Sequence, residues 1–203
     1  MASSLHIALV SVHGLIRSSR LELGRNADTG GQTKYVVELA AALGACYPEG
    51  RVELLTRRIE DESYGPDYAE ECEPLGEHAR IVRLPCGPAG YVRKELLYPH
   101  LDDFVAEAIR YYDAQGARPD VFPDVFHGHY ADGGYVALRL AEHYGVPFLF
   151  TGHSLGRNKV KALLKTGLSE DELEVEYSMS RRIAIEEEAL RRAERVIAST
   201  EYE

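Results

Sequence analysis

The chain has 203 residues, 45% of them hydrophobic and 28% charged, which is enough to bury the core of one α/β domain. Its formal net charge of -10 repels nucleic acid and anionic membranes at long range, so we expect neither as a partner, and an anionic ligand would need a local group of cations. The sequence lacks both an apolar run near about 18 residues and a secretory signal, which excludes a membrane span and predicts a cytoplasmic protein.

Short apolar runs alternate with helical patterns along the chain. Residues 6–11 (HIALVS) predict a buried strand, and after a loop of about twenty residues the apolar spacing of 29–44 predicts a helix. Further strands are predicted at 52–56, 80–84, 124–127, 147–151 and 195–199, and further helices at 101–112, 134–143 and 171–193. This order predicts an α/β, Rossmann-like fold, with a largely parallel sheet, helices on both faces and a ligand crevice at the carboxyl ends of the strands.

The first motif, DTGGQ at 28–32, lies where the loop enters the first helix. Gly30 and Gly31 permit positive φ and let a ligand approach the backbone, while the helix N-terminus offers N–H groups to phosphate or sugar oxygens. An equally acceptable interpretation is a turn in which Asp28 or Thr29 caps the helix. The motif fits neither GxGxxG nor GxxxxGK[ST], which disfavours a dinucleotide oxidoreductase and a P-loop nucleotidase.

The second motif, HGHYADGG at 127–134, follows the strand predicted at 124–127. Its hydrogen-bonding side chains stand where the crevice of an α/β fold needs them. His127, His129 and Asp132 also carry groups that suit zinc or iron, so a metal-dependent hydrolase is an alternative. Spacing of the HExxH type is absent, and we expect no metal.

The third motif, TGHSLGRNK at 151–159, also follows a predicted strand. His153 can donate a hydrogen bond or a proton, and Ser154 and Lys159 can hold a hydroxyl group and an anion. GHSLG also fits the GxSxG pattern of α/β-hydrolases, with Ser154 as nucleophile. That fold places its histidine after the serine, and no histidine follows Ser154, so the hydrolase hypothesis fails for this chain.

Two basic pairs are further candidate anion ligands: Arg93 with Lys94, and Arg181 with Arg182. Such pairs more commonly lie on a solvated helix face. Together with Lys159 they form a candidate phosphate site, because a phosphomonoester needs two or three cationic donors and arginine can bind it through two nitrogens.

Four blocks of the sequence, in order, resemble the sucrose-phosphate synthase family and, more distantly, sucrose synthases: SVHGLIRSSRLELGRNADTGGQTKYVVELAAAL, YVRKELLYPHL, HGHYADGG and FTGHSLGRNKVKALL. The blocks extend over nearly the whole chain. The resemblance implies one half of a GT-B glycosyltransferase, whose N-terminal domain binds the acceptor and whose C-terminal domain binds the nucleotide sugar. It also implies retaining transfer of glucose from UDP-glucose or ADP-glucose to fructose 6-phosphate, giving sucrose 6-phosphate in sucrose biosynthesis, without a cofactor or an active-site metal.

The same resemblance assigns roles to individual residues. His153 falls on the cleft histidine of the family, which is suited to hydrogen-bond the donor glucose and steady an oxocarbenium-like transition state. Gly31 would face the donor diphosphate. Arg93 departs from the pattern, which has proline there. The implied fructose 6-phosphate contacts are Gly30, Gln32, Lys94, Tyr130, Ser154, Lys159 and Arg182, with Lys159 and Arg182 as the phosphate ligands.

Residues 1–203 are accordingly expected to form a single Rossmann-like acceptor-binding domain that ends before its final elements and before the C-terminal donor-binding domain. Without the donor-binding domain, we expect the chain to bind acceptor weakly and to transfer no sugar. Two alternatives stay open. One is a sucrose synthase that uses free fructose, and the other is a stand-alone sugar-phosphate-binding module.

Overall fold

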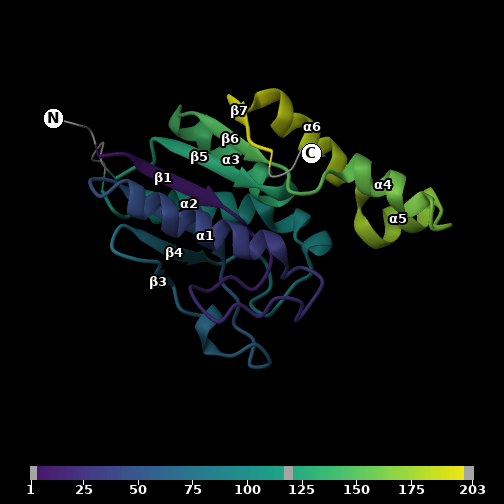
Figure 1. The fold of residues 1–203 in the computed structure, drawn as a ribbon, viewed down its shortest axis with the longest axis horizontal. Coiled ribbons are helices and arrows are strands. Elements are labelled where there is room, and N and C mark those ends of the chain that lie inside the picture. Colours follow the sequence, from purple (N-terminus) through teal and green to yellow (C-terminus); the bar gives the residue numbers. More distant parts are fainter. Residues whose placement is uncertain (1–3, 117–120, 199–203) are drawn as a thin grey trace.

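A seven-stranded sheet organises the protein (Figure 1). The computed structural model describes residues 4–116 and 121–198. Neighbouring strands are parallel, except that β3 runs antiparallel to β4. The predicted parallel, Rossmann-like sheet is therefore confirmed. In sheet order the strands are β3 (Cys72–Pro74), β4 (Ala79–Leu84), β2 (Arg51–Arg57), β1 (His6–Val10), β5 (Val125–His129), β6 (Phe148–Thr151) and β7 (Arg195–Val196).

Six α-helices and three short 3-10 helices connect the strands in the described part of the chain. None of these helices is both long enough and apolar enough to cross a membrane. The α-helices are α1 (Gly31–Cys46), α2 (Leu101–Asp113), α3 (Tyr130–Tyr144), α4 (Gly156–Leu164), α5 (Glu170–Tyr177) and α6 (Met179–Arg192), and the 3-10 helices are η1 (Pro66–Tyr68), η2 (Lys94–Leu96) and η3 (Tyr98–His100).

The two faces of the sheet carry separate apolar cores, as the alternation of side chains along a strand requires. In β1, Ile7 and Leu9 pack in the core that includes residues of α1. Ala8 and Val10 lie in the other core, with residues of α2, α3 and α6. All five residues of β1 are buried, which is typical of a central strand in a parallel sheet covered on both faces.

The C-terminal third differs from the sequence-based expectation. The single helix predicted at 171–193 is wrong, because Ser178 adopts a left-handed backbone with φ of 49° and separates α5 from α6. The pattern also fails to predict β3 and α4. Helices α4 and α5 form a hairpin that projects beyond one end of the sheet (Figure 1). Of the strand predicted at 195–199, β7 covers Arg195–Val196, and residue 199 lies outside the described residues.

Candidate functional site

The three sequence motifs meet at the carboxyl edge of the sheet. β1, β5 and β6 are neighbours and run parallel, so the segments that follow them emerge side by side. The DTGGQ loop leads from β1 into α1, Tyr130 follows β5, and His153 follows β6. Contact across this edge is direct, because the ring of Tyr35 in α1 packs edge-on against His153 with 5.0 Å between ring centroids.

Asp28 anchors Lys94 at this edge. The Lys94 Nζ lies 2.5 Å from Asp28 Oδ1, while the Lys94 backbone N–H (3.0 Å) and the Tyr91 hydroxyl (2.5 Å) both donate to Oδ2. Burial alone would raise the pKa of Asp28, but these hydrogen bonds from Lys94 and Tyr91 hold it below its ordinary value. Asp28 therefore fastens the DTGGQ loop to the loop before η2. The capping interpretation is wrong, because no side chain caps α1 and Thr29 Oγ1 instead accepts from the backbone of Leu15.

Gly30 and Gly31 leave the start of α1 open. A methyl group on either would meet nothing within 4 Å, and neither residue has a positive φ, so that part of the expectation is wrong. The glycines of the second motif behave differently, since a methyl group on Gly128 or Gly133 would lie within 2.6 Å or 2.3 Å of backbone atoms. Close packing therefore explains Gly128 and Gly133, whereas Gly30 and Gly31 leave room for a ligand to approach the helix N-terminus.

Arg182 is buried within the site, with 2% of its surface exposed. Its Nε donates to Glu186 Oε1 at 2.7 Å, its Nη2 donates to the carbonyl oxygen of Ser154, and its guanidinium carbon lies 4.4 Å from the centroid of the Tyr130 ring. Burial raises the pKa of Glu186, although its ion pair with Arg182 acts in the opposite direction. Arg182 thus joins α6 to the segments after β5 and β6, and its Nε and Nη2 are engaged within the protein.

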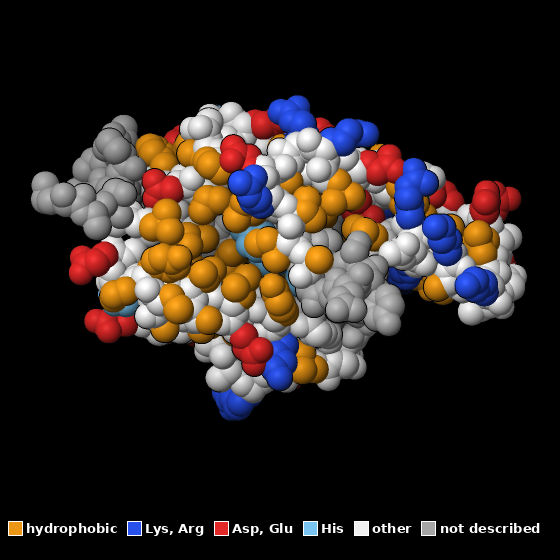
Figure 2. Space-filling model, turned by 45° about the horizontal axis from the view of Figure 1, so that its top comes forward, with side chains coloured by type: hydrophobic (Ala, Val, Ile, Leu, Met, Phe, Trp, Pro, Cys, Tyr) orange, Lys and Arg blue, Asp and Glu red, His pale blue; other side chains and the backbone are white. Residues whose placement is uncertain are grey.

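Lys159 brings a third cation to the same region. Its Nζ lies 4.2 Å from the centroid of the Tyr177 ring, on the hairpin of α4 and α5. Burial, together with the charges of Arg182 and Lys94, lowers the pKa of Lys159. Figure 2 shows lysine and arginine side chains gathered over this hairpin, although the chain as a whole is acidic. A bound phosphate would relieve the repulsion among these cations.

The remaining predicted residues are distributed around this edge. Gln32 donates to Ser11 Oγ at 3.2 Å, and Ser154 is exposed beside His153. Arg93 turns instead to Glu176 in α5, with Nη2 2.7 Å from Oε1, so it links the loop before η2 to the hairpin. The predicted residues therefore lie around the carboxyl edge of the sheet, and Arg93 has a structural partner in Glu176.

Two buried histidines lie beside His153. His127 is 4% exposed, and His129, with no exposed surface, places Nδ1 3.0 Å from His153 Nε2. Asp132 instead pairs with His13, whose Nδ1 lies 2.7 Å from Oδ2. Within the described residues no three His, Cys, Asp or Glu side chains are placed to hold a metal ion, so His127, His129 and Asp132 do not form the ligand set of the metal-hydrolase alternative.

These buried histidines predict a loss of stability in mild acid. Burial lowers the pKa of His127 to about 4 and that of His129 well below its ordinary value. The unfolded chain binds these protons at about pH 6.5, so the free energy of unfolding should fall below that pH by about 1.4 kcal/mol per pH unit for each histidine, until the folded pKa is reached.

Urea denaturation between about pH 7.5 and about pH 5 measures this dependence. His127→Gln should remove one histidine's share of the slope. The matched control His143→Gln changes an exposed histidine and should leave the buried pair's contribution in place. A slope in His127→Gln as steep as in the wild type would contradict the prediction.

Some features of the site have no signal in the sequence. Tyr130 and His153 both adopt a left-handed backbone, with φ of 65° and 59°. Such strain costs about 1–3 kcal/mol in a residue other than glycine and clusters at ligand sites.

Tyr91 is a site residue that the sequence analysis missed. It could have been singled out, because it lies in the same sequence block as Lys94, but its contact with Asp28 spans 63 residues.

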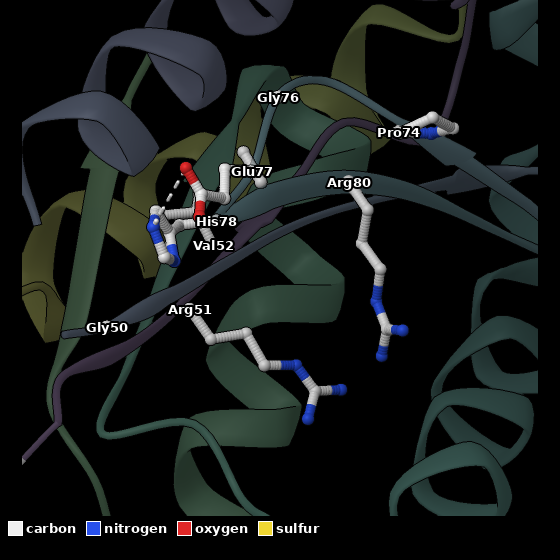
Figure 3. A pocket seen from close by; sticks show the side chains of 9 residues that line it. Gly50, Arg51, Val52, Pro74, Gly76, Glu77, His78 and Arg80 are labelled. Atoms are coloured by element: carbon white, nitrogen blue, oxygen red, sulfur yellow. Dashed lines mark ion pairs between the residues drawn. The ribbon is translucent and has the colours of Figure 1, made fainter. Parts of the chain in front are cut away.

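A hollow of about 430 Å³ lies at the opposite edge of the sheet, where β2 and β4 begin (Figure 3). Arg51 and Arg80 extend on one side of it, and both bind the fully buried Glu53 through their Nε atoms at 3.0 Å and 2.9 Å. These guanidinium groups are engaged in holding the starts of two strands together. The residues lining this hollow are distinct from the motif residues: Gly50, Arg51, Val52, Pro74, Gly76, Glu77, His78, Ala79 and Arg80.

Known proteins resemble this chain along almost its whole length. A family model described as "Glycosyl transferase 4-like domain" matches residues 30–203. The chain is 44% identical over 219 residues to sucrose-phosphate synthase 4 of Arabidopsis thaliana and 46% identical over 221 residues to sucrose-phosphate synthase of Zea mays. Each alignment covers 98% of this chain and 21% of the relative. The chain thus spans about a fifth of the length of these curated relatives.

Similarity to a solved structure leads to the same group of proteins. A sucrose-phosphate synthase from Thermosynechococcus elongatus superposes with a TM-score of 0.71 at 28% identity, covering 95% of this chain and 41% of that chain. These similarities confirm the resemblance seen in the four sequence blocks and the expected GT-B class of fold.

Proposed function

The chain belongs to the glycosyl transferase 4-like family, and we propose that it is the acceptor-binding half of a sucrose-phosphate synthase. The acceptor is fructose 6-phosphate, and the reaction is retaining transfer of glucose from UDP-glucose or ADP-glucose. In this proposal a second domain, outside residues 1–203, binds the donor. The observation that carries the proposal is the electrostatic interaction of Lys159 with Arg182 and Lys94. Lys94 in turn is tied by Asp28 to the loop before the open start of α1.

In this proposal each of the groups at the carboxyl edge of the sheet has a defined role in the reaction. Lys159 binds the phosphate, because Arg182 already uses Nε and Nη2 within the protein and assists from a buried position. Tyr130, Ser154 and Gln32 supply hydrogen bonds to the fructose hydroxyl groups, around a position next to Gly30. On the donor side, the N-terminus of α1 at Gly31 faces the diphosphate, and its partial positive charge favours that anion.

His153 stands between the acceptor position and the donor side. Its role is to hydrogen-bond the donor glucose and to hold it while positive charge develops on the sugar ring. No covalent attack by His153 is required. The left-handed backbone at His153 fixes where the imidazole leaves the chain and so helps to keep its orientation constant.

The phosphate-binding role predicts that Lys159→Gln weakens the binding of fructose 6-phosphate. One lost charged hydrogen bond corresponds to about 1.5–3 kcal/mol, or roughly a 10- to 150-fold increase in Kd. Calorimetry with fructose 6-phosphate and with free fructose measures both the loss and its dependence on the phosphate. We expect the wild type to prefer the phosphorylated sugar and Lys159→Gln to lose most of that preference.

The matched control is Lys161→Gln, which removes an exposed lysine from the same helix. It should change the affinity by much less, because an exposed charge at a distance is screened by salt. Equal losses in the two variants, or equal affinities of the wild type for fructose and fructose 6-phosphate, would contradict the proposed function.

A further inference from the structure

The hairpin of α4 and α5 is held to the rest of the protein at few points. It projects beyond one end of the sheet, and α4 and α5 each bury a single residue, Gly156 and Leu173 (Figure 1). At the base of the hairpin, the backbone N–H of Gly156 donates to Glu186, and Arg157 donates to Glu187, both in α6. Because so little of the hairpin is buried, packing alone fixes its position only weakly.

A single ion pair ties the hairpin to the loop before η2. Arg93 Nη2 lies 2.7 Å from Oε1 of Glu176, near the end of α5. In the part of the chain that the structure describes, this is the only side-chain hydrogen bond between α4 or α5 and a segment other than α6. The guanidinium also faces the buried carboxylate of Glu95, with Nε 3.5 Å from Oε2. Arg93 therefore lies between a carboxylate of its own segment and a carboxylate of the hairpin.

Both members of this ion pair adjoin a candidate ligand of the phosphate. Arg93 directly precedes Lys94 in the chain. Glu176 directly precedes Tyr177, and the centroid of the Tyr177 ring lies 4.2 Å from Lys159 Nζ. The ion pair thus connects the segment that carries Lys94 to the end of the helix that contacts Lys159.

Electrostatic repulsion acts against the approach of the hairpin to the site. Burial and the positive charges of Arg182 and Lys94 lower the pKa of Lys159. Without a bound anion, this repulsion favours movement of the hairpin away from the other two cations. Such movement need not bend α6, because α5 ends at the left-handed residue Ser178 and is not continuous with α6.

We propose that Arg93 is a positioning residue, which through its ion pair with Glu176 holds the hairpin where Lys159 can reach the phosphate of the acceptor. This inference rests on the proposed function, in which Lys159 binds that phosphate. Both partners of the pair are about half exposed, so its effect is limited to the range of exposed ion pairs. We expect about 2- to 5-fold, the upper part of that range, because Glu95 already orients the guanidinium.

Hydrogen exchange without ligand tests whether the ion pair holds the hairpin. Arg93→Gln and Glu176→Gln should each raise the exchange rates of the backbone amides of residues 173–177 by about 2- to 5-fold. The double variant should raise them no further, because either substitution already breaks the pair. Glu170→Gln is the matched control, since it removes the same charge from the exposed first turn of α5 and should leave these amides unchanged.

Calorimetry tests whether the ion pair positions Lys159. Arg93→Gln and Glu176→Gln should both raise the Kd of fructose 6-phosphate by about 2- to 5-fold and leave the Kd of free fructose nearly unchanged. The sign of the change in Glu176→Gln is decisive. By electrostatics alone, removal of a negative charge near the cations would strengthen the binding of an anion. The control Glu170→Gln should accordingly bind fructose 6-phosphate as well as the wild type does, or slightly better.

Three results would each overturn the role of Arg93: unchanged exchange rates in both variants, faster exchange with an unchanged Kd, or tighter binding of fructose 6-phosphate by Glu176→Gln. A wild type without preference for the phosphorylated sugar would remove the proposed function, and the positioning of Lys159 with it. The exchange rates distinguish these failures, because they are measured without ligand and show by themselves whether Arg93 and Glu176 hold the hairpin.

Discussion

Replacing Arg182 with methionine should lower the free energy of unfolding by about 3–5 kcal/mol, because it leaves Glu186 as a buried carboxylate without its cation. Arg182 and Glu186 are 2% and 3% exposed, and Nε lies 2.7 Å from Oε1. The other oxygen of Glu186 accepts from the backbone N–H of Gly156 at 2.6 Å, which holds the carboxylate at the start of α4. Methionine can fill much of the same space but cannot pair with the charge.

The destabilisation should depend on pH. Burial already raises the pKa of Glu186 while Arg182 is present, and removing Arg182 takes away a charge that lowers it. In the variant, the folded state therefore binds a proton more tightly than the unfolded state. Its stability is retained at low pH and is lost as the pH rises above the ordinary pKa of glutamate, at about 4.3. The difference from the wild type should be larger at about pH 7.5 than at about pH 5.5.

Urea denaturation at the two pH values gives these differences, with the wild type measured alongside each variant. Adding Glu186→Gln to Arg182→Met should recover much of the loss, since no charge is then left unpaired. Arg181→Met is the matched control, because Arg181 is the exposed neighbour in the same helix. A loss in Arg182→Met no larger than in Arg181→Met would show that the ion pair contributes little.

Because Arg182 belongs to a buried ion pair, substitutions of Arg182 are a poor test of the acceptor site. Any change at Arg182 alters both the fold and the cation cluster, so weaker ligand binding in such a variant has two explanations. Lys159 is half-buried and lies against Tyr177, and within the described part of the chain it forms no ion pair with a buried carboxylate. Lys159→Gln is therefore the cleaner probe of phosphate binding.

The order of strands and helices could be predicted because buried parallel strands appear as short apolar runs between helical patterns. β1 is the clearest example, with five buried residues in a row. The break at Ser178 could not be predicted, since neither glycine nor proline stands there and a serine takes the left-handed conformation. The start of α5 did have a signal, because Ser169 and Glu172 form a capping box, the spacing that marks a helix N-terminus.

The candidate site could be predicted as a set of residue types but not as a set of contacts. Strand ends locate the motifs, because parallel strands deliver their carboxyl ends to one edge. The partner of Lys94 could not be predicted, since Asp28 lies 66 residues earlier and the sequence offers it only as one of two possible helix caps. The pairing of Arg182 with Glu186 had a local sign in their spacing of four residues on a helix, but its burial depends on the packing of α6 against α3.

Gly133→Ala should lower the free energy of unfolding by about 3 kcal/mol, at the upper end of the usual effect of overpacking. A methyl group on Gly133 would lie 2.3 Å from the backbone carbonyl oxygen of Val10. Val10 belongs to the central strand and cannot move aside as a flexible side chain could, so α3 must shift away from β1. Alanine favours a helix over glycine by about 1 kcal/mol, which offsets only part of this loss.

Gly30→Ala is the matched substitution, because its methyl group meets nothing within 4 Å and the φ of Gly30 is -137°. Thermal denaturation should show a clear loss for Gly133→Ala and a change within about 0.5 kcal/mol for Gly30→Ala. Because Gly30 is proposed to lie against the acceptor, Gly30→Ala should instead weaken the binding of fructose 6-phosphate. A loss of stability in Gly30→Ala as large as that in Gly133→Ala would mean that packing requires both glycines. The two variants therefore separate a glycine that lets two elements pack from a glycine that leaves room for a ligand.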